Sequence, residues 1–316
     1  MEAELLDAFF RGEQGFGAVG MQNLAAPLSG APRREVPLTA YHVLSTLPFF
    51  SRNPGKEFAL EEFEILTAKL SALCWRRYNG PVFMVTDPAG AKYLREKKLD
   101  VLYDGVKVLL SMDEQGIPAG RFWASSKILA LGKLPLPCVI LDMDLIVWEP
   151  LPLENVALAA AHTEDLFPEI YPPLSTFRLS PRYHFPQWDE TVEPLNTSIL
   201  YMADENLRDH YVRNAVAFMQ YERHSPDNGA RCMVLAEQRI LAMCAAELGI
   251  RFQTFLDYDH LDAPQSLITH TWSGKGILRG QEDARTRFIQ LCRQKLQRLQ
   301  NLGQKTRDHR PRVGDG

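Results

Sequence analysis

Short apolar runs alternate with segments of helical periodicity along the first half of the chain, and this alternation limits the folds open to it. Tyr41–Phe50 contains a predicted buried strand that is stopped by Pro48, and Val82–Thr86 is a second predicted strand. Phe58–Tyr78 carries apolar residues at helical spacing. A helix over Arg121–Leu131 and a strand over Val139–Leu141 are expected next. Parallel neighbours need a crossover that a helix usually supplies, so the pattern predicts an α/β fold with a mixed, mostly parallel sheet flanked by helices.

One domain is expected to span residues 35–280. The chain has 316 residues, of which 46% are hydrophobic and 23% charged, and this is enough to bury the core of one large α/β domain. Residues 1–34 mix glycine, proline and polar residues and are predicted to form an N-terminal extension. A C-terminal amphipathic helix is expected at 281–302, followed by a disordered tail at 303–316.

Charge and cysteine content narrow the class of protein. A formal net charge of -4 argues against a nucleic-acid partner bound through overall charge. The five cysteines are odd in number and never spaced as CxxC, which favours reduced core thiols in a reducing cytoplasm. No charged n-region followed by an apolar h-region opens the sequence, and no apolar run reaches the length of a membrane span. We therefore expect a cytoplasmic protein.

The stretch PLPCVILDMDLIVWEPL, from Pro135 to Leu151, sets Asp142 and Asp144 at the end of a predicted buried strand. Two adjacent ionised carboxylates repel, and burying either without a partner is costly, so a protein cation or a metal should lie against them. Mg²⁺ and Mn²⁺ take carboxylate ligands, and ligands of open α/β sheets bind beyond the carboxyl ends of strands. The alternative is that one aspartate caps the next turn while the other is solvated.

This stretch resembles the DxD motif of GT-A glycosyltransferases, in which it holds a divalent metal on the diphosphate of a nucleotide-sugar. It also resembles the opening motif of haloacid-dehalogenase-type phosphatases, in which the first aspartate, here Asp142, would be the nucleophile. In that phosphatase motif Gly-Thr usually follows the second aspartate, whereas Leu145 and Ile146 follow here. The GT-A class fits better. It implies a Rossmann-like nucleotide-diphospho-sugar transferase related to glycosyltransferase families 8 and 32, among bacterial members that are uncharacterised or of the capsular-polysaccharide type.

Further stretches follow in the order that this resemblance implies. In FWASSKILAL, Lys127 would approach the nucleotide-sugar, although a helical lysine is often only solvated. EPLNTSILYM places Asn196 where the corresponding strand lies under the donor sugar. In AEQRILAMCAAELG, Glu237 and Gln238 match an acidic residue and an amide that contact the transferred sugar. Glu replaces the usual Asp there, and Met243 departs from the usual Asn.

LITHTWSGKG supplies the last part of the expected site. By the same resemblance His270 completes the metal site with the two aspartates, while Gly274 and Lys275 contact the diphosphate. An imidazole beside two carboxylates suits Mn²⁺ better than Mg²⁺. Thr46 and Asp87, each near the end of a predicted strand, would lie near the nucleotide; a buried strand threonine and a turn-forming aspartate are the alternatives.

The resemblance implies a metal-dependent, hexosyltransferase-type enzyme that moves a sugar with retention, and from a UDP-sugar in preference to other donors, to a hydroxyl acceptor. The acceptor would be a glycan or lipid-linked glycan in cell-surface polysaccharide or glycoconjugate synthesis. The basic helix at 281–302 would then allow contact with the inner face of a membrane, although packing on its own domain is the simpler role. Besides the phosphatase, a nucleotide- or glycan-binding protein without turnover stays open.

Overall fold

The computed structural model of the protein describes residues 9–10, 18–111, 116–223, 229–261, 263 and 265–308. Its centre is a seven-stranded sheet in the order β3-β2-β1-β4-β7-β6-β8, beside a two-stranded sheet of β5 and β9. The strands are β1 (Ala40–Leu44), β2 (Val82–Thr86), β3 (Val106–Val108), β4 (Cys138–Leu141), β5 (Leu145–Val147), β6 (Leu158–Ala160), β7 (Ile199–Met202), β8 (Phe252–Thr254) and β9 (Ile268–His270). In the larger sheet β7 runs antiparallel to both of its neighbours, and the other pairs are parallel. The mixed, mostly parallel sheet predicted from the sequence is confirmed.

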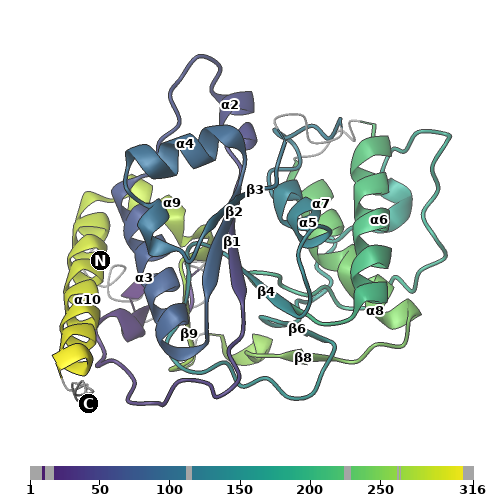
Figure 1. The fold of residues 1–316 in the computed structure, drawn as a ribbon. Coiled ribbons are helices and arrows are strands. Elements are labelled where there is room, and N and C mark those ends of the chain that lie inside the picture. The colour runs from purple at the N-terminus through teal and green to yellow at the C-terminus, as the bar shows by residue number, and fades with distance from the viewer. Residues whose placement is uncertain are drawn as a thin grey trace, which may run out of the picture.

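Helices cover both faces of the larger sheet, with α3 and α4 on one side and α5 to α8 on the other (Figure 1). The helices are α2 (Leu47–Arg52), α3 (Glu62–Tyr78), α4 (Pro88–Glu96), α5 (Ser125–Leu131), α6 (Glu205–Tyr221), α7 (Gly229–Val234), α8 (Ile240–Glu247), α9 (Lys275–Gly280) and α10 (Glu282–Asp308). On β4, Ile140 packs with α5 to α8, whereas Val139 and Leu141 pack towards α3 and α4. Successive side chains of a strand point to opposite faces, so a strand covered on both faces has to be apolar throughout.

A third apolar cluster joins α10 and the described part of the N-terminal region to the outer side of α3. Phe288 of α10 meets Phe63 of α3 with ring centroids 6.4 Å apart, and Met21 and Leu24 are buried in the same cluster. Residues 18–24 therefore pack into the core. α10 continues to Asp308, past its predicted end at 302, and residues 309–316 of the predicted tail lie outside the described residues.

Two basic side chains of the C-terminal helices form ion pairs with the protein itself. Arg293 pairs with Glu62 of α3, and Arg279 of α9 pairs with Glu61 and Glu64 at the start of the same helix. These contacts favour packing on the domain and give no support to membrane contact. In the part of the chain that the structure describes, no helix combines the length and apolar character that a bilayer crossing requires.

The strand predicted from Tyr41 to a stop at Pro48 is shorter than expected. β1 ends at Leu44, and α2 begins at Leu47 with Pro48 in its first turn. The backbone N–H and the hydroxyl of Thr46 both donate to the carboxylate of Asp87, at 2.6 and 3.0 Å, and this draws the chain off the sheet. Proline fits the first turn of a helix because an N–H there has no intrahelical acceptor.

Candidate active site

A cavity of about 570 Å³ opens beyond the carboxyl ends of β1 and β4. This volume is typical of small-molecule sites, and the position is the crevice where open α/β sheets bind ligands. Most of the residues predicted to act on a donor line it: Lys127, Asp142, Asp144, Asn196, Glu237, Gln238, His270 and Lys275. Ser45, Glu64 and Thr67 line the wall formed by the end of β1 and by α3.

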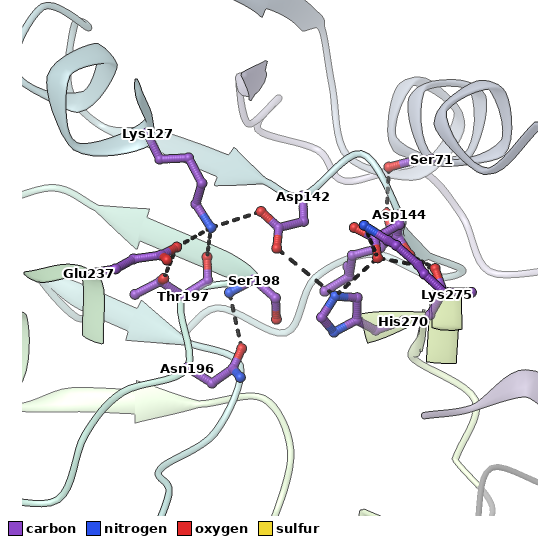
Figure 2. Close-up of polar contacts among 12 residues, drawn as sticks. Ser71, Lys127, Asp142, Asp144, Asn196, Thr197, Ser198, Glu237, His270 and Lys275 are labelled. Atoms are coloured by element: carbon purple, nitrogen blue, oxygen red, sulfur yellow. Dashed lines mark hydrogen bonds and ion pairs between the residues drawn. The ribbon is translucent and has the colours of Figure 1, made fainter. Parts of the chain in front are cut away.

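Asp142 and Asp144 lie in the tight turn that joins β4 to β5. The Asp142 N–H donates to Ser198 O at 2.8 Å, and the Leu145 N–H donates back to Asp142 O at 3.0 Å. β5 pairs with β9 so that Leu145 stands opposite His270. His270 Nε2 therefore lies 3.6 Å from Asp144 Oδ2 and 4.0 Å from Asp142 Oδ2 (Figure 2). One ligand atom from each of these three side chains lies within 4.8 Å of the others.

Two lysines approach the aspartates from opposite sides (Figure 2). Lys127 Nζ lies 2.8 Å from Asp142 Oδ1, and Lys275 Nζ lies 3.0 Å from Asp144 Oδ2. Thr271 Oγ1 adds a hydrogen bond to Asp144 Oδ2 at 3.1 Å. The positive partners that the sequence required are thus present as protein cations, and a histidine is available beside them.

Burial and neighbouring charges set the protonation of these groups. Burial raises the pKa of Asp142 in spite of Lys127, and Asp144 adds to the rise. Burial would also raise the pKa of Asp144, but Lys275 and His270 outweigh it and lower that pKa to about 2. Burial lowers the pKa of His270 against the pull of both aspartates, so its imidazole is neutral at pH 7.

The side chains present fit a divalent cation. Asp144 is ionised and His270 is neutral, and these are the protonation states that metal ligands need. Two carboxylates and one imidazole form a donor set that Mn²⁺ accepts more readily than Mg²⁺ does. The third carboxylate, Glu237, and the two lysines leave the group with a net negative charge, which favours cation binding.

Glu237 and Gln238 line the cavity wall that faces the aspartates. The Glu237 carboxylate forms an ion pair with Lys127 and accepts a hydrogen bond from Thr197 Oγ1 at 2.8 Å. The side-chain oxygen of Gln238 lies within hydrogen-bond distance of the Tyr171 hydroxyl. Both predicted sugar-contacting residues are therefore held in place by neighbours before any ligand arrives.

Lys127 has protein acceptors for all three of its N–H bonds. Besides Asp142 and Glu237, its ammonium donates to Thr197 O at 3.2 Å. Burial alone would lower the pKa of Lys127, but Asp142 and Glu237 raise it, so the lysine stays charged. With 15% of its side chain exposed, Lys127 is not a merely solvated lysine. It connects the aspartate turn to the opposite wall.

Asn196 lines the cavity with both ends of its amide engaged. Its Nδ2 donates to Glu164 Oε1 at 2.7 Å, and its Oδ1 accepts from the Ser198 N–H at 3.1 Å. The Tyr171 hydroxyl donates to the other oxygen of Glu164. Sequence reasoning missed Glu164, because the segment around it shows no periodicity that would assign a direction to its side chain.

Three residues predicted to bind the donor do not line the cavity. Thr46 and Asp87 are fully buried and bonded to each other, and the Gly90 N–H gives Asp87 a further hydrogen bond at 2.8 Å. Ser45 occupies the lining position next to them. Gly274 is also absent from the lining, although the adjacent residue of α9 is part of it.

The sequence analysis did not anticipate one residue that lines the cavity and one that supports Asp144. Glu64 lines the cavity one helical turn before Thr67, and Thr271 follows His270 directly and supports Asp144; these positions were the only signals for them in the sequence.

Trp272 lines the cavity with its ring parallel to that of His270, at a centroid distance of 6.1 Å and an interplanar angle of 4°. Its φ of 42° is strained for a bulky side chain, and such strain is found mainly at functional sites.

The fold and the site define the class of this protein. It is an α/β protein with a candidate divalent-metal centre at the carboxyl edge of its main sheet. The profile of a family of unknown function (DUF6734) matches residues 53–271, which is more than half of the chain, and the chain belongs to that family. No curated protein matches the sequence.

Solved structures that resemble the chain are distant. Mouse xyloside xylosyltransferase 1 in its apo form is 13% identical, with a TM-score of 0.35 over 70% of this chain and 85% of that one. The galactosyltransferase LgtC in complex with donor and acceptor sugar analogs is 12% identical, with a TM-score of 0.37 over 63% and 70%. The PaToxG glycosyltransferase is 10% identical, with a TM-score of 0.40 over 94% and 92%. At such values none of them indicates an activity for this chain.

Proposed function

We propose that this protein is a metal-dependent glycosyltransferase of the GT-A class, which moves a sugar from a nucleoside-diphosphate donor to a hydroxyl acceptor. One observation supports this most directly. Asp142, Asp144 and His270 converge beside Lys275 in a cavity that is large enough for a nucleotide-sugar. Carboxylate and imidazole ligands next to a lysine suit a divalent metal bound to a diphosphate.

In this proposal the two aspartates and His270 would hold the metal, Mn²⁺ in preference to Mg²⁺. When bound, the metal would neutralise charge on the donor diphosphate. Lys275, now paired with Asp144, is placed to turn to the phosphate oxygens and to offset the charge that grows on the leaving diphosphate. Glu237, Gln238 and Asn196, on the opposite wall, would orient the donor sugar.

The finer features of the proposal rest on the sequence resemblance to families 8 and 32. They are a UDP-sugar donor, transfer of a hexose, retention at the anomeric carbon, and a glycan or lipid-linked acceptor in cell-surface polysaccharide synthesis at the cytoplasmic side. The preformed contacts of Glu237 with Lys127 and Thr197 support a role for this carboxylate in fixing the donor sugar. Carboxylate and amide groups held in advance lose little entropy when they bind a sugar hydroxyl.

The first experiment measures thermal unfolding with UDP, GDP, CDP and ADP, each with and without Mn²⁺. A ligand at about a hundred times its Kd stabilises the folded state by about 2.7 kcal/mol, which is easily detected. We expect one nucleotide to stabilise the wild type only with metal, and Asp144→Asn to abolish the effect. Asp209→Asn, which changes an exposed aspartate of α6, is the control and should keep it.

Other results of these unfolding experiments would contradict the proposed function. Stabilisation by Mg²⁺ with beryllofluoride but by no nucleotide would replace the transferase with a phosphatase that uses Asp142. Metal-dependent nucleotide binding without hydrolysis or transfer of any donor sugar would indicate a binding protein without turnover. Nucleotide stabilisation that survives Asp144→Asn would remove the aspartate turn from the site.

A further inference from the structure

The helix that carries Glu237 is widened into a π-helix at Leu235–Arg239, between α7 and α8. Its last turn closes through the Ile240 N–H, which donates to Leu235 O, five residues earlier. Single π turns within α-helices are rare and occur frequently at functional sites. Here the widened turn contains the two residues that face the candidate metal centre.

Three consecutive side chains of this turn contact three different parts of the protein. They are Glu237 with Lys127 and Thr197, Gln238 with Tyr171, and Arg239 with the backbone oxygens of Pro172 and Glu190 at 2.7 and 2.9 Å. Side chains of neighbouring residues on a helix point about 100° apart, and the adjacent Met233 and Val234 of α7 also line the cavity. Glu237 and Gln238 also line the cavity, and both belong to the π turn, so the path of its backbone sets where these two side chains lie.

Tyr211 of α6 supports the widened turn from behind. Its hydroxyl donates to the backbone oxygen of Glu237 at 2.8 Å, and its side chain is 1% exposed. The Leu195 N–H approaches the next carbonyl, that of Gln238, at 3.5 Å. A carbonyl oxygen has two lone pairs, so it can accept such a bond in addition to one from an amide of its own helix. Two donors from outside the helix therefore hold successive carbonyls of the π turn in place.

We propose that Tyr211 is a positioning residue, whose hydroxyl stabilises the π-helix and thereby holds Glu237 and Gln238 towards the substrate. Its role in turnover rests on the proposed glycosyltransferase function. Tyr211 does not line the main cavity, and its hydroxyl is linked to that cavity through the backbone oxygen of Glu237. A small displacement of a group that orients substrate is enough to slow a reaction strongly.

The test compares Tyr211→Phe with a matched control, Tyr183→Phe. Tyr183 packs against the same apolar cluster, and among the described residues its hydroxyl has no hydrogen-bond partner. Tyr211→Phe should lower kcat for sugar transfer by about tenfold to a hundredfold, with less than about a threefold change in donor KM and in metal-dependent nucleotide affinity. Amide hydrogen exchange over residues 235–241 should accelerate in this variant. Tyr183→Phe should leave all of these quantities unchanged.

Two results would overturn the inference. The first is wild-type kcat in Tyr211→Phe, and the second is a parallel loss of kcat and nucleotide affinity, which would indicate a general disturbance of the cavity. If the wild type transfers no sugar from any donor, the proposed function fails, but the exchange measurement still decides the role of Tyr211. Equal exchange over 235–241 in both variants would then refute it.

Discussion

The ammonium of Lys127 lies 2.8 Å from Oδ1 of Asp142 and also forms an ion pair with Glu237. A single cation thus joins one carboxylate of the candidate metal centre to the carboxylate on the facing wall (Figure 2). The side chains of Lys127 and Glu237 are 15% and 12% exposed, so water screens this pair weakly. Removing the cation would leave buried carboxylates without a counter-charge, which is far more costly than losing a surface ion pair.

Lys127→Met should therefore lower the free energy of unfolding by about 3 kcal/mol or more without metal. Added Mn²⁺ should reduce this loss, because the metal would supply positive charge beside Asp142. Chemical denaturation with and without Mn²⁺ measures both effects. Lys92→Met, at a surface pair whose side chains are 72% and 59% exposed, should cost less than about 0.5 kcal/mol with or without metal. Equal losses in the two variants would contradict a buried network.

Lys275 should affect nucleotide binding more than metal binding. In the structure its ammonium forms an ion pair with Asp144 Oδ2 and so competes with a metal for this oxygen. Lys275→Gln removes that competition and should not weaken the affinity for Mn²⁺ alone. The same change removes a charged donor to the diphosphate, and affinity for the metal–nucleotide complex should fall by about tenfold to a hundredfold. Calorimetric titration of Mn²⁺, and then of the nucleotide at saturating Mn²⁺, separates the two.

The control for this substitution is Lys133→Gln. Lys133 donates to Leu109 O at the surface and should leave both affinities unchanged. A loss of Mn²⁺ affinity in Lys275→Gln, in the absence of nucleotide, would show that this lysine supports the metal ligands themselves.

The aspartate turn and β2 were predicted well because their signals are local. A continuous apolar run bounded by turn residues specifies a buried strand, and β2 has the predicted limits of Val82–Thr86. The partners of the turn could only be inferred through the family resemblance. The approach of His270 to Asp144 depends on the pairing of two three-residue strands, β5 and β9, whose register no local pattern specifies.

Other failures have equally specific causes. The strand predicted from Tyr41 to Pro48 was too long because the contact between Thr46 and Asp87 joins distant segments, and an apolar run does not reveal this contact. No sequence pattern indicated the π turn at Glu237, since helices are recognised from the sequence by a constant period of 3.6 residues. That Glu237 and Gln238 both belong to the site was therefore inferred from the resemblance alone.

Gly20 should be needed for the geometry of His270. Val19 and His270 exchange two backbone hydrogen bonds of 2.9 Å, so the N-terminal segment runs alongside β9. Gly20 has a φ of 62°, and a Cβ there would lie 2.0 Å from Ile268 O. Gly20→Ala should therefore push the segment away from β9 and lower the affinity for Mn²⁺. Calorimetric titration of Mn²⁺ measures this, and Gly30→Ala, where a Cβ meets nothing within 4 Å, is the control. Unchanged affinity in Gly20→Ala would show that β9 holds His270 without this contact.

His42 should make the protein less stable in acid. Ser71 Oγ donates its proton to Leu145 O, so His42 Nε2 has to donate to Ser71 while Nδ1 accepts from the Tyr103 hydroxyl, which describes a neutral imidazole. Burial lowers the pKa of His42 to about 3, with a small opposing effect of Asp144. Below the ordinary pKa of about 6.5, His42 binds a proton in the unfolded chain but stays neutral in the folded protein. The free energy of unfolding therefore falls as the pH drops from 6.5 to 3.

His42→Gln removes this contribution, and urea unfolding of the wild type and the variant at pH 7 and pH 4 tests it. Over the whole interval from pH 6.5 to pH 3 the loss of stability amounts to about 5 kcal/mol, and most of that loss should already be present at pH 4. At pH 7 the wild type should be the more stable, because glutamine cannot reproduce both hydrogen bonds of the ring. At pH 4 the advantage should shrink by several kcal/mol or reverse. A difference that stays constant between the two pH values would mean that the imidazole of His42 is protonated in the folded protein as readily as in the unfolded chain.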